Sequence, residues 1–170
     1  MIQNCSYIRV LEVFFKEPTK VHFIREISRK IDLAQTSVRN HIKTMEKENL
    51  IEKKESKPFN GFVANRENEK FISYKQVYNL YSLITLKKEI AEKIGPKAII
   101  LFGSYQKGED IEESDVDLVV ISKIKKEIPL GKYEKRLSRN IHITFVKDVN
   151  RADKNIRDNL KRGWILYGRI

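Results

Sequence analysis

Two aspartates, Asp115 and Asp117, stand one residue apart at the start of the largely apolar run 116–121. If this run is a strand, both carboxylates lie on one face, roughly 6–7 Å apart, because successive side chains alternate between faces. Two like charges this close are unfavourable unless a cation joins them. Carboxylate oxygens suit Mg²⁺ or Mn²⁺, and the phosphates of a substrate can supply the remaining ligands. The pair therefore predicts a site for a divalent cation shared with a phosphate compound.

A Gly103-Ser104 pair directly follows a second apolar run, residues 98–102. Glycine lets the backbone N–H groups of a turn approach an anion closely, and the serine hydroxyl adds one more donor. We therefore expect this turn to face the two carboxylates and to bind phosphate.

The segments LFGSYQKG (residues 101–108) and SDVDL (residues 114–118) resemble the polymerase beta-like nucleotidyltransferases, and above all their small, minimal members. The family pattern is a Gly-Ser pair, a basic residue followed by glycine, and then Ser-Asp-x-Asp before a hydrophobic residue. The resemblance covers about residues 95–170. It implies an α/β (α+β) domain with a small mixed sheet.

The resemblance also implies roles for these residues. Asp115 and Asp117 would be the catalytic residues and would bind Mg²⁺ or Mn²⁺. Gly103, Ser104 and Lys107 would hold the phosphates of a nucleoside triphosphate (NTP), with ATP as the first choice. The product would be a nucleotidyl ester, with release of pyrophosphate. Small family members often work beside a HEPN-type toxin and modify it, so such a toxin is one expected partner.

The first part of the chain shows a different pattern. Apolar residues at helical spacing predict three helices before residue 50, and Asn60-Gly61 predicts the turn of a hairpin. This order resembles a winged helix-turn-helix domain, which we place at residues 1–66. Its third helix would enter the major groove of DNA, and its hairpin would contact the flanking backbone or minor groove. The candidate nucleic-acid contacts on that helix and hairpin are Gln35, Thr36, Arg39, Asn40, Lys43, Lys53, Lys54 and Lys57.

Residues 67–94 carry apolar and aromatic side chains at helical steps as far as Gly95-Pro96, which predicts one long helix. The simplest interpretation is a connector between the first domain and a nucleotidyltransferase domain at residues 95–170. The seam of a homodimer is the second interpretation. Beyond the connector we expect strands at 97–102, 116–121, 141–146 and 164–167, with helices near 129–138 and 148–162.

Composition adds broad limits. The 170 residues carry a net charge of +11, which favours polyanions such as nucleic acid, although a lysine-rich composition of the source organism would explain part of it. The single cysteine, Cys5, excludes an internal disulfide. The sequence has no apolar run of membrane-spanning length and no signal-peptide pattern. We therefore expect a cytoplasmic protein that does not bind membranes.

The predicted strand 141–146 departs from the family pattern. Active members usually carry a third carboxylate there, whereas its polar face shows His142 and Thr144, and the nearest acids, Glu134 and Asp148, fall outside the strand. Neutral imidazole is a poor ligand for Mg²⁺. Two hypotheses stay open: a working nucleotidyltransferase, or a DNA-binding transcriptional regulator whose degenerate nucleotidyltransferase domain only senses a nucleotide or mediates association.

Overall fold

The computed structural model describes residues 5–55, 59–148 and 153–169. The chain divides into two compact units, Met1–Lys75 and Gln76–Ile170. The boundary falls inside helix α4 (Glu69–Ser82). None of the helices in the described ranges has the length and apolarity needed to cross a membrane.

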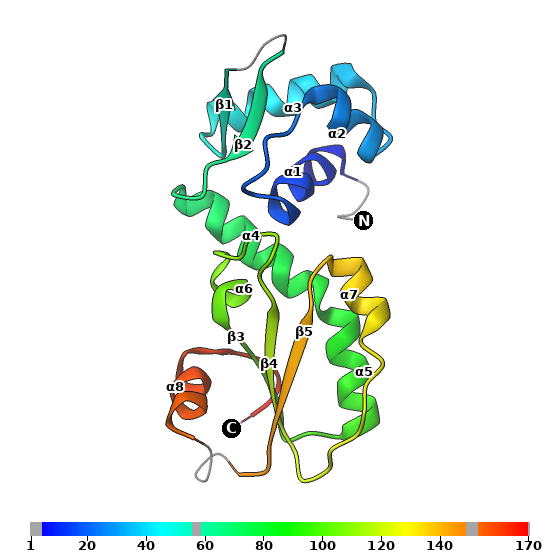
Figure 1. Cartoon of the computed structure of the whole chain (residues 1–170), viewed down its shortest axis with the longest axis vertical. Coiled ribbons are helices and arrows are strands. Elements are labelled where there is room, and N and C mark those ends of the chain that lie inside the picture. Colours follow the sequence, from blue (N-terminus) through cyan, green and yellow to red (C-terminus); the bar gives the residue numbers. More distant parts are fainter. Residues whose placement is uncertain (1–4, 56–58, 149–152, 170) are drawn as a thin grey trace. The chain divides into compact units, whose positions relative to one another are not determined.

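In the N-terminal unit three helices precede a two-stranded hairpin (Figure 1). The helices are α1 (Ser6–Lys16), α2 (Ile24–Lys30) and α3 (Gln35–Lys47), and the antiparallel strands are β1 (Ile51–Lys54) and β2 (Gly61–Ala64). Each helix contributes fully buried side chains to one core, among them Phe14, Ile27 and Ile42. The elements follow the order predicted from the apolar spacing. The assignment of this unit to the winged helix-turn-helix class stays a prediction.

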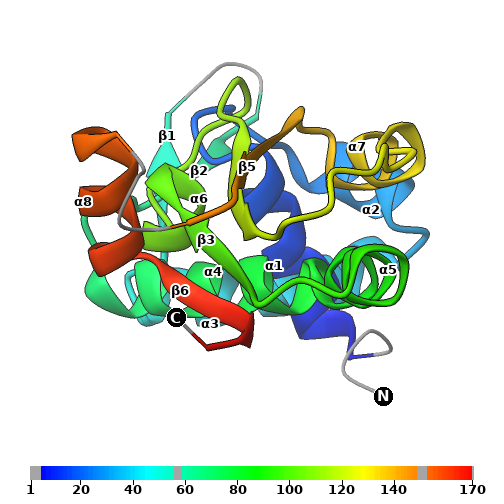
Figure 2. The ribbon, with the colours of Figure 1, turned by 90° about the horizontal axis from the view of Figure 1, so that it is seen from below.

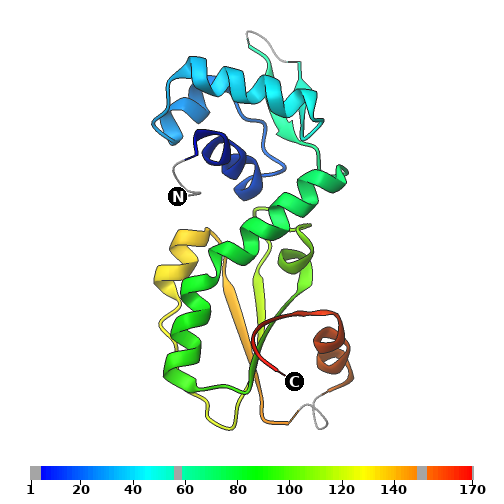
Figure 3. The same cartoon turned by 180° about the vertical axis from the view of Figure 1, so that it is seen from behind.

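The prediction of one long helix over residues 67–94 is wrong. This segment forms two helices, α4 and α5 (Ile84–Ile94), separated by Leu83, and the chain changes direction there (Figure 3). The Leu83 N–H donates to the Leu80 carbonyl at 3.2 Å, which closes a tighter turn than an α-helix, and the Leu83 side chain is 1% exposed. A buried leucine fits the apolar stripe of one helix or of two, so the hydrophobic spacing does not reveal the break. The predicted stop at Gly95 is confirmed, since this residue caps α5 in the left-handed conformation.

The C-terminal unit is built on a four-stranded mixed sheet in the order β5-β4-β3-β6. The strands are β3 (Ala98–Phe102), β4 (Val116–Ile121), β5 (Ile141–Val146) and β6 (Trp164–Gly168). β4 runs parallel to β5, whereas β3 is antiparallel to both β4 and β6. The register places Asp117 beside Phe102 on β3 and beside His142 on β5. The sheet therefore brings three remote segments together around Asp117.

Helices cover both faces of this sheet. Short helix α6 (Gly103–Lys107) follows β3, α7 (Gly131–Leu137) precedes β5, and α8 (Lys154–Arg162) precedes β6. One face packs against α5 and α7, and the opposite face packs against α8 (Figure 2). Asp117 shares its face with Val119, which lies in the core beneath α8. The carboxylate therefore stands at the end of the sheet face that α8 covers.

Candidate active site

The two aspartates lie where the sequence placed them, Asp115 just before β4 and Asp117 as its second residue. Gly103 opens α6 directly after β3 and adopts a φ of 80°. A Cβ atom at this position would come within 2.8 Å of Asp117 Oδ2. Glycine therefore suits both the left-handed backbone and the close approach of the carboxylate. The structure thus places the Gly103-Ser104 turn against Asp117, as predicted.

The electrostatics of the pair favour a cation. Burial raises the pKa of Asp117 above its ordinary value, His142 lowers that pKa, and Asp115 raises it again. A bound cation would remove the cost of holding a partly buried charge beside a second one. The donor set fits a divalent ion that takes its remaining ligands from phosphate and water. Within the described residues, no group of three or more His, Cys, Asp or Glu side chains could hold a metal ion by itself.

The side chains around Asp115 come from β5 and the residue before it. Asn140 Nδ2 donates to Asp115 Oδ1 at 3.2 Å, and His142 Nε2 lies 3.2 Å from Asp115 Oδ2. The Glu134 side chain binds the backbone at the start of β5, where its Oε1 accepts the Ile141 N–H at 3.1 Å. The third-strand departure noted in the sequence is therefore present in the structure. The contact of Asn140 with Asp115 was not predicted, since an asparagine before a strand is an ordinary turn residue.

The two other predicted phosphate contacts lie on α6. Ser104 is half-buried, and Lys107 is exposed, with its Nζ 3.8 Å from Glu109 Oε2. An exposed ion pair of this length contributes little free energy, so Lys107 can exchange its acidic neighbour for a phosphate group.

Two open hollows of the C-terminal unit, of about 260 and 350 Å³, lie along α5 and β6. Neither is lined by Asp115 or Asp117. The carboxylates and the Gly103-Ser104 turn offer the charged and hydrogen-bonding groups that a site for polar chemistry needs, whereas these hollows are lined largely by apolar side chains and lysines.

The predicted nucleic-acid contacts that the structure describes share one property, which is exposure to solvent. The exposed residues are Gln35, Thr36, Arg39, Asn40 and Lys43 of α3, together with Lys53 and Lys54 of β1. The opposite side of α3 is buried through Val38, Ile42 and Met45, so the division into an apolar and a polar face is as predicted. Lys57 lies outside the described residues. The role of this face in binding nucleic acid stays a prediction.

Comparison with known proteins gives the class of the C-terminal unit. Residues 83–165 match the family model described as "Nucleotidyltransferase domain". The matched region begins at the break between α4 and α5 and contains both aspartates and the Gly103-Ser104 turn. Residues 83–165 are therefore similar to a nucleotidyltransferase domain, and such domains generally use divalent metal ions.

A particular relative is a protein of Methanocaldococcus jannaschii that bears the name "Putative protein adenylyltransferase MJ1379". The similarity is 53% identity over 34 residues, which is 20% of this chain and 34% of the relative. The match thus spans about a third of the relative's length.

Proposed function

We propose that the C-terminal unit binds a nucleoside triphosphate, with ATP as the first choice, together with Mg²⁺ or Mn²⁺, and transfers a nucleotidyl group to an acceptor. The observation that carries this proposal is the close approach of Asp117 to Gly103, which joins the carboxylates to the phosphate-binding turn. The name of the Methanocaldococcus relative points to a protein as the acceptor and to AMP as the transferred group.

In this proposal the two aspartates have one task, and the residues of the turn and of α6 have another. Asp115 and Asp117 hold the cation, while Ser104 and Lys107 bind the β and γ phosphates. The cation, when bound, supplies positive charge that neutralises the phosphates and favours ionisation of the acceptor hydroxyl. The hydroxyl oxygen forms a bond to the α-phosphorus, the bond from that phosphorus to the bridging oxygen breaks, and pyrophosphate leaves. The hydroxyl proton passes to solvent.

A second candidate function, nucleotide sensing without turnover, is favoured by β5. His142 stands beside Asp117 in the position where a third carboxylate would serve, and it contacts Asp115. A two-aspartate site offsets only half of the charge of two divalent ions. One Mg–nucleotide would bind, but the cation that activates the acceptor would bind weakly, so chemistry would suffer more than binding.

For the N-terminal unit we propose binding of duplex DNA through the exposed face of α3 and the lysines of β1. The support is the division of α3 into a buried and a polar face, together with the net charge of +11. Under the second candidate function, the whole protein would be a transcriptional regulator that reads nucleotide levels.

The deciding experiment incubates the protein with each labelled NTP, with Mg²⁺ or Mn²⁺, and with candidate acceptors that include a HEPN-type toxin. The Asp115→Asn and Asp117→Asn double variant is the control. Transferred label and released pyrophosphate that both disappear in the variant would support the transferase. Metal-dependent NTP binding without pyrophosphate would support the sensor. Equal NTP affinity with and without metal would overturn both.

A further inference from the structure

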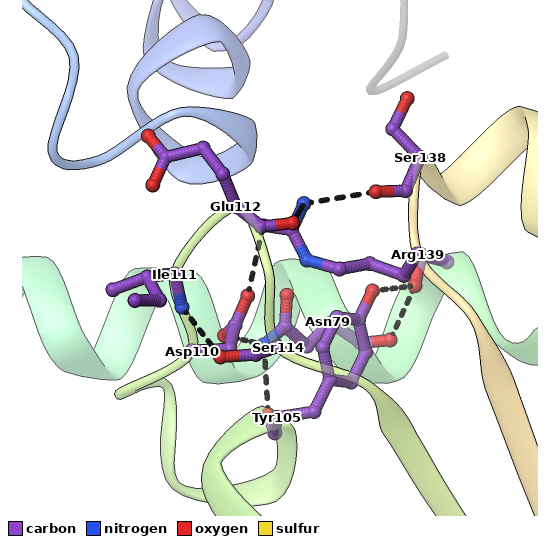
Figure 4. Close-up of polar contacts among 9 residues, drawn as sticks. Asn79, Tyr105, Asp110, Ile111, Glu112, Ser114, Ser138 and Arg139 are labelled. Carbon is purple, nitrogen blue, oxygen red and sulfur yellow. Dashed lines mark hydrogen bonds and ion pairs between the residues drawn. The ribbon is translucent and has the colours of Figure 1, made fainter.

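A buried ion pair lies beside the loop that leads to Asp115 (Figure 4). Arg139 Nη2 is 3.4 Å from Asp110 Oδ2, and the two side chains are 4% and 1% exposed. The other carboxylate oxygen of Asp110 accepts a hydrogen bond from Asn79 Nδ2 at 2.8 Å, and the same amide donates to the Tyr105 carbonyl at 2.7 Å. Both charges are buried, so removing one of them would take a close counter-charge from the other, at a cost in stability.

The guanidinium also holds the backbone of this loop. Arg139 Nη1 donates to the Glu112 carbonyl at 2.9 Å, so one planar group binds both a side chain and a main-chain oxygen of the loop. Within the loop, Ser114 Oγ accepts the Ile111 N–H at 2.9 Å. The next residue is Asp115. These bonds therefore fix the backbone immediately before the first carboxylate.

The chain beyond Arg139 reaches Asp115 from the other side. Asn140, the next residue, donates from Nδ2 to Asp115 Oδ1 at 3.2 Å. The Asn140 carbonyl accepts the Val116 N–H at 2.9 Å, which joins the start of β5 to the start of β4. Arg139 thus stands between the loop that precedes Asp115 and the segment that contacts its side chain.

We infer that the Arg139–Asp110 pair is a positioning group that sets Asp115 for the cation and the nucleotide. The inference rests on the proposed function, because that function names what the positioned carboxylate holds. Arg139 acts only through Asp115 and the loop before it. Lysine could not replace it fully, since a single ammonium lacks the planar fork that binds two oxygens at once.

Substitutions can separate positioning from simple stabilisation of the fold. Arg139→Met removes the guanidinium that faces the buried Asp110 carboxylate, so this variant should lose stability. Adding Asp110→Asn removes the buried carboxylate charge that faced the guanidinium and should recover the melting temperature, but it cannot recover the bond to the Glu112 carbonyl. Arg136→Met is the matched control, because Arg136 is an exposed arginine nearby whose hydrogen bonds go to residues on either side of the α4–α5 break.

The full-length variants and wild type are compared by melting, by calorimetry with ATP and Mn²⁺, and by hydrogen–deuterium exchange of residues 110–117. We expect the double variant to melt near wild type, to bind Mn–ATP about 10-fold to 100-fold more weakly, and to exchange faster in this segment. Arg136→Met should match wild type in Mn–ATP affinity and in exchange of this segment. If the double variant does not recover the wild-type melting temperature, Arg139→Lys is compared with wild type in the same three measurements. This variant keeps a positive charge opposite Asp110.

The possible failures are distinguishable. If the double variant melts, binds Mn–ATP and exchanges like wild type, the pair does not position Asp115, and the inference would be wrong. A wild-type protein that does not bind Mn–ATP would overturn the proposed function. Even then, unchanged exchange in residues 110–117 would overturn the inference, and faster exchange would support the ordering of this loop by the pair.

Discussion

The two units of this protein present their polar residues in different ways. In the C-terminal unit the candidate site brings together strands β3, β4 and β5, and Asp117 lies against Gly103 from a segment well before it in the sequence. In the N-terminal unit the candidate residues of α3 come from one helix and are all exposed. A contact between remote residues needs a particular fold, whereas an exposed polar face occurs on most surface helices. The structure therefore supports the C-terminal site more strongly than the N-terminal surface.

The largest effect should come from Gly103→Ala. The new methyl group would strain a left-handed backbone, at a cost of about 1–2 kcal/mol, and would push Asp117 Oδ2 out of place. Since small displacements at a reacting centre are costly, we expect metal-dependent NTP binding or transfer to fall about 100-fold. Calorimetry and transfer assays measure this. Gly131→Ala is the control, because a Cβ there meets nothing within 4 Å. If Gly103→Ala and Gly131→Ala show the same NTP affinity and the same transfer rate, the structure would no longer support the C-terminal site more strongly than the N-terminal surface.

The N-terminal surface can be tested by DNA binding. Arg39→Ala should cost about 1–3 kcal/mol of binding free energy at the preferred sequence if this arginine reads a guanine. Lys54→Ala should weaken binding to all DNA sequences alike and reduce the slope of log affinity against log salt concentration by about 0.9. Fluorescence anisotropy over a salt series measures both, with Lys88→Ala of the C-terminal unit as an exposed-lysine control. If none of these changes affects DNA affinity, the face of α3 is only a solvated surface.

The missing carboxylate on β5 can be restored. His142→Asp places an acid beside Asp117 and near Asp115, so it should raise nucleotidyl transfer about tenfold by strengthening cation binding. Thr144→Asp is the control, because Thr144 pairs with Val119, roughly 7 Å farther along the strand. If wild type transfers the nucleotidyl group rapidly and His142→Asp is slower, then a group other than a third carboxylate on β5 completes the site.

The smallest effect concerns Asp117 and stability. A raised pKa in the folded state means that the folded protein holds this proton more tightly than the unfolded chain does. The resulting stabilisation is fully present below the unfolded pKa and is lost as pH rises through the folded pKa. Without metal, Asp117→Asn should therefore melt slightly higher than wild type at pH 7, and this advantage should disappear in acid. Melting curves with and without Mn²⁺ test this, since only wild type should gain stability from the metal. If Asp117→Asn without metal melts at a lower temperature than wild type at pH 7, burial of the charged Asp117 carboxylate does not destabilise the fold.

Much of the C-terminal unit could be predicted from sequence because its strands are short apolar runs bounded by turn residues. β4 and β5 have the predicted bounds, and β3 and β6 differ by one residue. The approach of Gly103 to Asp117 also followed from the motif. The Arg139–Asp110 pair could not be foreseen, because Asp110 stands in an acidic stretch and Arg139 in a basic one, and both resemble solvated surface residues. In the structure Asn79 of α4 packs against this loop, and both Asp110 and Arg139 are buried.

The strand order has a consequence for how the chain acquires its fold. β3 lies between β4 and β6, and its pairing with β6 joins Ala98 to Gly168, about 70 residues apart in the sequence. Contacts of such long range form slowly, because a large loop must close before they are gained. Until β6 docks, β3 has an open edge made of five apolar residues, AIILF. An edge of this kind pairs readily with other chains, so we expect this domain to be most exposed to aggregation before β6 docks.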